Sequence, residues 1–390
     1  MDFDLTEEQR LLKDSVDRLI ADRYGFENRK KYLSDPTGHS RDLWAAYAEL
    51  GLLGLPFPEA RGGFGGGPVE IAIVMEAFGR GLILEPFFAT VILGGGLIRH
   101  LASPAQQDAL LPRIAGGGLR LGFAHLERQS RWNLADVATT ATAGATGAPG
   151  GWTLRGAKSV VLHGDCADRL LVTARVSGGR TDRAGVGLFL VDPTAPGCAR
   201  RGVPTQDGLR AAEITLDGAA GEALGAPDGG PNGALAGIEA AVDAAIAALC
   251  AEAVGAMTAL HELTVEYLKT RKQFGRPIGS FQALQHRAVD MLTAVEQARS
   301  MALFATVSAE EPDPIARRRA ITAAKAQIGR AARLVGQEAI QLHGGIGMTM
   351  EYAAGHYFKR LTMIDQMFGD ADRHLAELAA LGGLFGASAA

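Results

Sequence analysis

Basic, aromatic and amide side chains gather in one segment of the chain and recur in a second, glycine-rich segment. Arg271 is followed closely by Phe274 and then by Gln282, and the second segment runs from Gln341 through several glycines to Gly347. An arginine can hold a pyrophosphate through two hydrogen bonds, and an aromatic side chain can pack on a flat ring. Glycine lets the backbone approach phosphate oxygens closely. These residue types suit a long anionic cofactor that lies against helices.

Long helices are the elements that must position these side chains. From residue 234 to about residue 380 the chain is rich in alanine and other apolar residues, which is typical of packed helices. The first part of the chain is helical in pattern as well. Thr6 and Gln9 have the spacing of a capping box, so a helix is predicted to begin there. Two further helices are predicted at residues 69–81 and 90–101.

The pattern changes near residue 121, where short apolar or alternating runs are separated by turn residues. Residues 213–217 alternate in the manner of a half-buried strand. Glycine-rich segments at 147–151 and 177–179 predict hairpin turns, and a third at 225–233 predicts a boundary. The other strands are predicted at residues 139–142, 152–154, 170–176 and 186–191.

The order of helices, then strands, then helices predicts an α+β fold. We expect an N-terminal helical domain at residues 1–120, a central β domain at 121–228 and a C-terminal helical bundle at 229–390. A chain of 390 residues exceeds one ordinary hydrophobic core, which agrees with two or three domains. We expect the bundle to form the core of an oligomer, because its alanine-rich helices need more apolar surface than one chain offers.

The composition excludes several classes of function. Apolar residues make up 47% of the chain and charged residues 21%, as in globular proteins with a large buried core. A net charge of -4 without a basic tract argues against nucleic acid as a partner. The sequence contains no GxGxxG fingerprint, no Walker A loop and no HExxH motif, so these nucleotide and metal sites are not expected.

The cysteines and the apolar segment at residues 240–260 bear on the cellular compartment. Cys166, Cys198 and Cys250 are odd in number and lack metal-ligand spacing, so we expect reduced thiols and no metal site. Asp243 interrupts the apolar segment, which therefore predicts a buried bundle helix and not a membrane span. The first residues are acidic and do not have the pattern of a signal peptide. We expect a cytoplasmic protein.

Segments 271–275 and 341–347, together with the order of the elements, resemble the acyl-CoA dehydrogenases over essentially the whole chain. The resemblance implies an N-terminal helical domain, a central antiparallel β domain and a C-terminal four-helix bundle. It implies FAD as the cofactor and the oxidation of an acyl-CoA to its trans-2-enoyl-CoA, with electrons passing to an electron-transfer flavoprotein. In that family the FAD lies between two subunits, and the neighbour's bundle contacts its adenosine and pyrophosphate end.

The residues that the family uses at the adenosine end of FAD look intact in this sequence. Each of them alone could be structural, since a helical glutamine is usually solvated and a phenylalanine usually belongs to a core. Their joint spacing favours binding. The resemblance therefore implies that FAD is contacted by Arg271, Phe274, Gln282, Gln341, Gly344 and Gly345.

The flavin end departs from the family's pattern. Family members carry a Thr-Glu pair in the first β segment, but here Leu126 precedes Glu127. A later motif, Gly-x-Lys-x-Trp-Ile-Thr, begins here at Gly156 and has Val160 in place of the tryptophan and Leu162 in place of the threonine. Aliphatic side chains cannot donate the hydrogen bonds that the tryptophan and the threonine would make.

The catalytic glutamate of the family is also missing. Gly369 stands at its usual position, and Asp370 follows one residue later. Some members place the glutamate on the first bundle helix, where this chain has Ala245. Glu252 lies on the same helical face but about 10 Å along the axis, which is too far for proton abstraction. Asp243 matches an aspartate that contacts coenzyme A in relatives, although it could equally cap a helix end.

Two explanations of these losses remain open. In the first, Asp370 is a shifted base in a self-sufficient homotetramer. In the second, this chain holds the adenosine end of FAD, while a related large subunit supplies the flavin contacts and the glutamate in an α2β2 assembly. We favour the second explanation, because the losses fall on the flavin and base side alone and random drift would not sort them in that way.

The chain resembles most closely the small subunit of the pimeloyl-CoA dehydrogenase type, for example at residues 3–12, 279–282 and 355–362. That resemblance implies that the chain acts together with a large subunit in the degradation of acids. The sequence is also compatible with two further functions. An acyl-CoA oxidase would pass electrons directly to oxygen, and a non-enzymatic stabilising subunit would bind neither FAD nor acyl-CoA.

Overall fold

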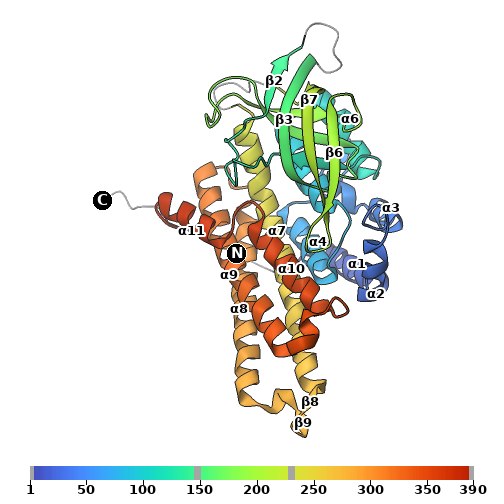
Figure 1. The fold of residues 1–390 in the computed structure, drawn as a ribbon, viewed down its shortest axis with the longest axis vertical. Helices are drawn as coiled ribbons and strands as arrows, with labels where there is room; N and C mark the ends of the chain where they lie inside the picture. Colours follow the sequence, from blue (N-terminus) through green and yellow to red (C-terminus); the bar gives the residue numbers. More distant parts are fainter. Residues whose placement is uncertain (1–3, 145–150, 227–232, 386–390) are drawn as a thin grey trace. The chain divides into compact units, whose positions relative to one another are not determined.

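Figure 1 shows the fold in a computed structural model, which describes residues 4–144, 151–226 and 233–385. Helices at the two ends of the chain flank a central run of strands, so the predicted α+β fold is confirmed. Most of the turn predicted at residues 147–151 and most of the boundary predicted at 225–233 lie outside the described residues.

The packing divides the chain into two compact units, which we call the bundle unit and the sheet unit. The N-terminal helices are shared between the two units. The predicted domains, divided at residues 120 and 228, are consecutive in the sequence, whereas each compact unit combines separate segments. The division into three domains therefore remains a proposal. The bundle unit contains Met1–Leu33, Gly67–Ile83 and Ile246–Ala390, and the sheet unit contains Ser34–Gly66 and Leu84–Ala245.

The bundle unit is built from long helices joined by short connections (Figure 1). The longest, α7, begins in the sheet unit, but most of its length belongs to the bundle unit. The helices of the bundle unit are α1 (Glu7–Arg23), α2 (Phe26–Leu33), α4 (Pro68–Gly81), α7 (Leu235–Thr270), η5 (Ile278–Ser280), α8 (Gln282–Ser308), α9 (Pro314–His343), η6 (Gly344–Met348), α10 (Ala353–Gln366) and α11 (Ala371–Ala380).

Helix α1 begins with the predicted capping box. The backbone N–H of Gln9 donates to the Thr6 hydroxyl at 3.2 Å, and the backbone N–H of Thr6 donates to the Gln9 side chain at 3.0 Å. Two backbone donors that the first turn leaves unpaired are satisfied in this way. The predicted start of the first helix is confirmed.

Helix α4 packs against α7 through glycines on both helices. A Cβ atom on Gly79 would lie 1.9 Å from the carbonyl oxygen of Glu252, and one on Gly255 would lie 1.9 Å from that of Glu76. Any larger residue at either glycine would push the two backbones apart. The close crossing explains why an N-terminal helix belongs to the same compact unit as the C-terminal bundle.

The sheet unit is organised around a seven-stranded sheet. Hydrogen-bonded neighbours follow the order β1–β4–β2–β3–β7–β5, with β6 paired to β7 and β5 also paired to β4. Most pairs are antiparallel, as predicted, but β1 and β2 each pair with β4 in parallel. The strands are β1 (Leu121–Ala124), β2 (Thr140–Ala143), β3 (Gly151–Leu162), β4 (Arg169–Arg175), β5 (Val186–Val191), β6 (Cys198–Pro204) and β7 (Arg210–Ala223).

Strand β3 is much longer than the run predicted at residues 152–154, because its exposed side carries polar residues that interrupt the apolar pattern. Its pairing with β7 shifts register between Lys158 and Val161. Val160 lies within this bulge at φ +50°, a conformation that is rare for a β-branched residue. The bulge falls on the segment that aligns with the flavin contacts of the family.

Short helices accompany the sheet in the same unit. The helix predicted at residues 90–101 is present, but its first part is wound as a π-helix, η3, before α5 begins. Gly94 and Gly95 lie there against Leu121 and Phe57, where a Cβ atom would come within 2.7 Å of a side chain. The helices of the sheet unit are α3 (Arg41–Glu49), η1 (Leu52–Gly54), η2 (Glu59–Arg61), η3 (Phe88–Gly94), α5 (Gly95–Leu101) and α6 (Pro104–Ala115).

Helix α7 is long and apolar enough to cross a membrane by length and composition alone. In the fold, however, 89% of its most apolar window is buried. This agrees with the prediction of a buried helix for residues 240–260, and many soluble proteins contain a core helix of this kind.

Candidate functional site

The connection between α7 and α8 is a small hairpin that presents an aromatic side chain to solvent. Strands β8 (Lys272–Gln273) and β9 (Arg276–Pro277) pair around a turn formed by Phe274 and Gly275. Both turn residues have positive φ, +52° and +75°, as a two-residue type I′ turn requires. The Phe274 side chain is 89% exposed. A bulky residue that adopts this backbone and leaves most of its ring exposed contributes little to the packing of its own chain.

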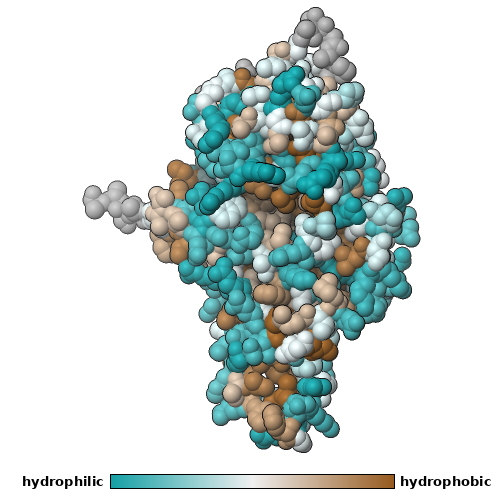
Figure 2. Space-filling model, in the orientation of Figure 1, coloured by the Kyte–Doolittle hydropathy of each residue, from teal (hydrophilic) through white to brown (hydrophobic). Residues whose placement is uncertain are grey.

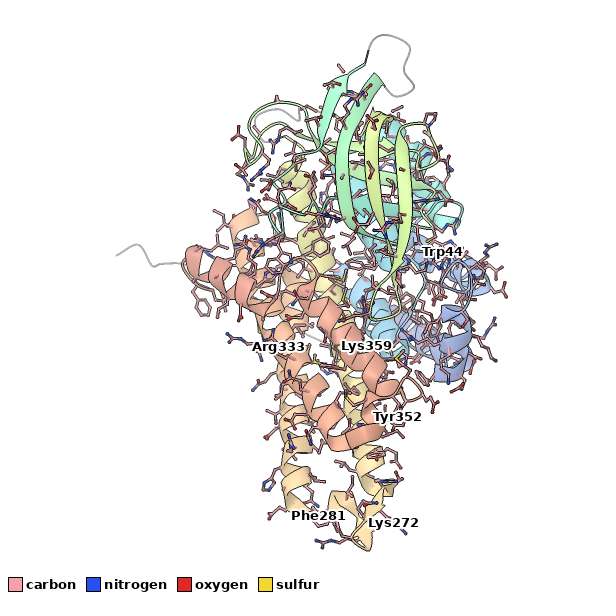
Figure 3. The ribbon with its side chains drawn as sticks, in the orientation of Figure 1. Trp44, Lys272, Phe281, Arg333, Tyr352 and Lys359 are labelled. Atoms are coloured by element: carbon pink, nitrogen blue, oxygen red, sulfur yellow. The ribbon has the colours of Figure 1, made fainter. Side chains whose placement is uncertain are left out.

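Other aromatic and basic groups surround this tip, and all of them belong to the bundle unit. The Phe274 ring meets the edge of the Phe281 ring at a centroid distance of 6.1 Å, and the Arg276 guanidinium lies 4.1 Å above the Phe281 ring. Arg271 and Gln282 are exposed beside them. Figure 3 labels Lys272 and Phe281 at this end of the bundle, and in Figure 2 brown, apolar residues gather over the same end.

The second glycine-rich segment lies at the end of α9. Gln341 is exposed in the last turn, and Gly344 ends the helix at φ +63°. A Cβ atom on Gly344 or on Gly345 would meet no atom of the described residues within 4 Å. Gly345 also has an ordinary φ, so nothing within the described chain requires a glycine there. A group from outside the chain that approaches this backbone would require one.

Three aromatic rings join the two segments. Tyr267, in the last turns of α7, lies 4.6 Å from the His343 ring, which lies 5.1 Å from Tyr352 just before α10. The backbone N–H of Arg271 donates to the carbonyl oxygen of Tyr267 at 2.9 Å. The structure thus brings to one end of the bundle all six predicted adenosine-end residues: Arg271, Phe274, Gln282, Gln341, Gly344 and Gly345.

The loop between α10 and α11 contains the position of the family's glutamate. Gly369 adopts φ +116°, which L-amino acids rarely take, and a Cβ atom there would lie 3.0 Å from His374. Lys325 is fully buried beneath the loop and donates to the carbonyl oxygens of Asp365 at 2.8 Å and Gly369 at 2.9 Å. Burial lowers the pKa of Lys325 to about 8. A glutamate at this position would therefore be strained.

Asp370 is the N-cap residue of α11. Its carboxylate accepts a hydrogen bond of 2.8 Å from the backbone N–H of Arg373. The 14 residues of α10 separate this loop from Tyr352 at the adenosine end, which corresponds to roughly 20 Å along the helix axis. One chain therefore does not bring Asp370 together with the predicted FAD contacts.

The other candidate positions lie on α7. Asp243 is buried in the third turn of the helix, so the interpretation of this residue as a helix-end cap is wrong, because α7 begins at Leu235. Ala245 is buried. Glu252 makes a buried, two-bond ion pair with Arg360 at 2.6 and 2.8 Å, and this carboxylate is therefore engaged in holding α7 to α10.

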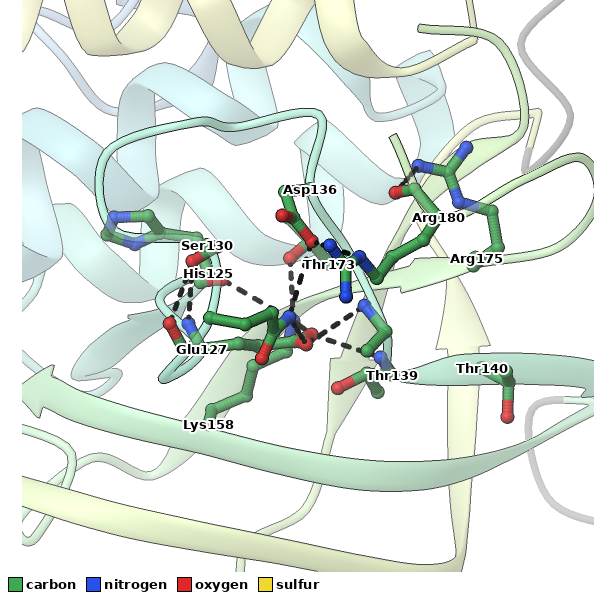
Figure 4. A network of polar contacts seen from close by, with 12 residues as sticks. His125, Glu127, Ser130, Asp136, Thr139, Thr140, Lys158, Thr173, Arg175 and Arg180 are labelled. Carbon is green, nitrogen blue, oxygen red and sulfur yellow. Dashed lines mark hydrogen bonds and ion pairs between the residues drawn. The ribbon is translucent and has the colours of Figure 1, made fainter. Parts of the chain in front are cut away.

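In the sheet unit, Glu127 is the centre of a buried polar network (Figure 4). Its carboxylate accepts hydrogen bonds from Lys158 Nζ at 2.6 Å, Gln129 Nε2 at 2.7 Å, and the backbone N–H groups of Ala138 at 2.9 Å and Thr139 at 3.0 Å. Burial alone would raise the pKa of Glu127, but the charge and hydrogen bond of Lys158, with the other donors, lower it to about 2. A carboxylate so firmly ionised is a structural anchor and a poor base.

The partnership between Glu127 and Lys158 was not foreseen from the sequence. Lys158 is 1% exposed and also donates to the Thr173 hydroxyl at 3.0 Å. The sequence did contain a signal for a buried charge at this position. Lys158 lies four residues after Leu154 and therefore shares its buried face of β3. A lone charged residue at an inward position requires a buried partner of opposite charge.

Beyond this network the sheet presents the two aliphatic side chains at the flavin-end positions. Val160 is 46% exposed, while Leu162 is half-buried. Neither side chain can donate or accept a hydrogen bond. These two side chains therefore cannot make the polar contacts to a flavin that the family's tryptophan and threonine would make. The predicted adenosine-end residues at the end of the bundle, in contrast, are exposed and, apart from the two glycines, polar, basic or aromatic.

Comparison with known proteins identifies the family of the chain. Models of the acyl-CoA dehydrogenase N-terminal, middle and C-terminal domains match residues 6–118, 122–218 and 238–381, respectively. Together they cover nearly the whole chain. The chain belongs to the acyl-CoA dehydrogenase family, and FAD is its cofactor.

Individual relatives are similar over almost their full length. Acyl-CoA dehydrogenase FadE12 of Mycobacterium tuberculosis is 30% identical over 358 residues, which cover 89% of this chain and 88% of the relative. A variant of the Tcur3481–Tcur3483 steroid ACAD is 30% identical, with a TM-score of 0.84 and coverage of 96% of this chain and 97% of that one. The ChsE4–ChsE5 complex from Mycobacterium tuberculosis is 25% identical, with a TM-score of 0.84 and coverage of 97% and 98%.

Replacing Glu127 by glutamine removes the counter-charge of a buried lysine. We expect the variant to lose roughly 3–5 kcal/mol of stability at pH 7, because the Lys158 ammonium stays buried and unpaired. The folded-state pKa of Glu127 lies below its ordinary value of 4.5, so its contribution is complete above that pH and is lost as the pH falls toward about 2. Unfolding followed by fluorescence should show the two proteins converging over this range, while the exposed control Glu59→Gln stays near wild type. A difference independent of pH would contradict the assignment.

The backbone at Gly369 can be tested by a matched pair of alanine substitutions. We expect Gly369→Ala to cost roughly 1–3 kcal/mol, because the new side chain must adopt a disfavoured φ close to His374. Gly345→Ala should change stability by less than about 0.5 kcal/mol, since its φ is ordinary and its Cβ meets nothing. Chemical denaturation measures both. Equal effects would contradict the view that only Gly369 is constrained by the fold.

Proposed function

We propose that this chain is one subunit of a heteromeric, FAD-dependent acyl-CoA dehydrogenase. It binds the adenosine end of FAD. A related large subunit supplies the contacts to the flavin end and the catalytic glutamate. One observation carries the proposal. The residues suited to the adenosine end are exposed together at one end of the bundle, while Val160, Leu162 and Gly369 occupy the flavin and base positions.

The residues at the bundle end have separate tasks in this proposal. Arg271 binds the pyrophosphate through two charge-assisted hydrogen bonds, as a guanidinium does with phosphate oxygens. The exposed ring of Phe274 packs against the cofactor, which explains a side chain that buries little in its own chain. Gln282 and Gln341 supply amide donors and acceptors to the polar end of the cofactor. When bound, FAD would supply the acceptor for the hydride from the β-carbon of the acyl-CoA.

Gly344 and Gly345 let the backbone of the α9 end lie against the same cofactor. The space beside both residues is open within the chain, as an external group in close contact would need. The separation of this end from the loop at Asp370 also supports a site completed by a second subunit, since the two regions lie roughly 20 Å apart along α10.

An apolar stripe on α8 supports assembly with a second, related chain. Its members are exposed although apolar, and their spacing places them within about 60° of one another around the helix. Such a face is stabilised when it is covered by another subunit. The relative described as the ChsE4–ChsE5 complex is an assembly of two chains, which supports the same inference. The stripe consists of Val289, Leu292, Leu303 and Val307.

The reaction of the assembly is the α,β-dehydrogenation of an acyl-CoA to its trans-2-enoyl-CoA. Electrons then pass to an electron-transfer flavoprotein in the cytoplasm, and the assembly is an α2β2 tetramer active in β-oxidation. The resemblance to the pimeloyl-CoA type supports an acid-degrading role. Asp243 remains the candidate contact to coenzyme A from this chain.

A self-sufficient homotetramer with Asp370 as the base is the second candidate. The position of Asp370, directly after the glutamate position, favours it. Its role as the cap of α11 weighs against it, because proton abstraction would compete with the hydrogen bond from Arg373. In that case Asp370→Asn, which can still cap the helix, would abolish turnover while flavin stays bound.

Replacing Arg271 by alanine tests the proposed adenosine-end contact. We expect FAD to bind about tenfold or more weakly to the assembly, because two hydrogen bonds to a charged group are lost. The fold should be unaffected, since the Arg271 side chain is exposed. Flavin absorbance per protein after gel filtration measures occupancy, and Arg330→Ala on the exposed side of α9 is the control. Unchanged occupancy in Arg271→Ala would contradict the proposal and favour a non-enzymatic subunit.

A further inference from the structure

The sheet unit contains a polar cavity of about 600 Å³ beside the start of β4. Its walls come from the loop between β3 and β4, the residue before β1, the turn after β5, strands β6 and β7, and the segment up to the first residue of α3. This volume is typical of sites for small molecules. None of the lining residues belongs to the Glu127 network or to the bundle end. Five of them are arginines: Arg41, Arg120, Arg169, Arg200 and Arg210.

The cavity carries more positive than negative charge. Three aspartates also line it, and each forms an ion pair with one of the arginines. Two guanidinium groups form no ion pair, although Asp192 interacts electrostatically with Arg200 and Asp35 with Arg41. With five arginines and three aspartates, the lining has an excess of two positive charges. The pairs are Arg120–Asp168 at 3.0 Å, Arg169–Asp192 at 3.2 Å, and Arg210–Asp165.

The two remaining arginines have donors to offer. Arg41 is exposed at the start of α3 and makes no hydrogen bond or ion pair with any residue that the structure describes. Arg200 donates through Nη1 to the carbonyl oxygens of Gly164 at 3.1 Å and Ala167 at 3.0 Å. These acceptors hold its side chain at the cavity but do not neutralise its charge. A guanidinium has five N–H donors, so most of those on Arg200 remain available.

Asp165 adds an acceptor with an unmet hydrogen bond. Its side chain is 8% exposed, and one carboxylate oxygen is engaged by Arg210. The other oxygen, Oδ1, is buried and receives no hydrogen bond from the described part of the chain. Buried polar atoms of this kind nearly always have a partner, because an unsatisfied acceptor is costly. A donor from a bound molecule would satisfy it.

From these observations we infer that the cavity binds a small dianion that also carries a hydroxyl group, such as the phosphate monoester of a polyol or a sugar. Arg41 and Arg200 hold the phosphate oxygens, for which the planar guanidinium is well shaped. The hydroxyl donates to Asp165. A concave site with a buried carboxylate suits a small molecule better than the acidic side chains of a protein partner, which meet flatter and more exposed surfaces.

Calorimetric titration of the FAD-loaded assembly with glycerol 3-phosphate and with inorganic phosphate tests this assignment, with sodium chloride at matched ionic strength. We expect saturable binding of both, and tighter binding of glycerol 3-phosphate. The double variant Arg41→Ala/Arg200→Ala should bind about tenfold or more weakly. Asp165→Asn should remove the preference for glycerol 3-phosphate over inorganic phosphate. Arg201→Ala, on the neighbouring exposed position of β6, is the matched control and should leave binding unchanged.

Several outcomes would overturn the assignment. One is the absence of saturable binding up to about 10 mM, which corresponds to less than about 3 kcal/mol. Another is binding that survives the double variant but disappears in Arg271→Ala, since the anion would then occupy the cofactor end of the bundle. A third outcome is that phosphate does not bind, while the double variant reduces a protein electron acceptor more slowly. The cavity would then be identified as a docking surface for a protein. Melting temperatures near wild type establish that each variant is folded.

Discussion

One buried lysine holds the loop in which the family's catalytic glutamate is expected. Lys325 donates to the carbonyl oxygens of Asp365 and Gly369 from beneath the loop between α10 and α11. These hydrogen bonds stabilise a backbone conformation at Gly369 that a glutamate would adopt only under strain. The glycine at the position where the family's glutamate is expected is therefore favoured by the packing of the bundle, and the neighbouring Asp370 contributes to that packing as the cap of α11.

The two halves of the candidate site differ in a consistent way. At the bundle end, Phe274 is exposed in a turn that gives it no core to join, and Gly345 is free of any internal requirement for glycine. Both features make sense when something outside the chain contacts them. At the predicted flavin end, Val160 is partly exposed and its side chain carries no polar group. The carboxylate of Glu127 is engaged in a buried ion pair with Lys158. A chain that completes a site in another subunit explains both halves together.

Sequence patterns predicted the features that depend on local spacing. The capping box of Thr6 and Gln9 and the extent of α4 are of this kind. Features that depend on residues far apart in the chain were not predictable, because no local pattern encodes them. The contact between Gly79 and α7, the partner of Lys158 and the arginine-lined cavity all arise where distant segments meet. The six adenosine-end residues were found only because their order resembles a known family, and their convergence at one bundle end supports that prediction.

The FAD content of the purified chain, alone and co-expressed with the related large subunit, tests the central claim most directly. Each preparation is then treated with a medium-chain acyl-CoA under anaerobic conditions, and bleaching of the flavin is measured. A shared site predicts little flavin in the isolated chain, and one flavin per pair of chains, bleached by substrate, in the co-expressed assembly. One flavin per chain, bleached without any partner, would contradict the account and establish a self-sufficient enzyme.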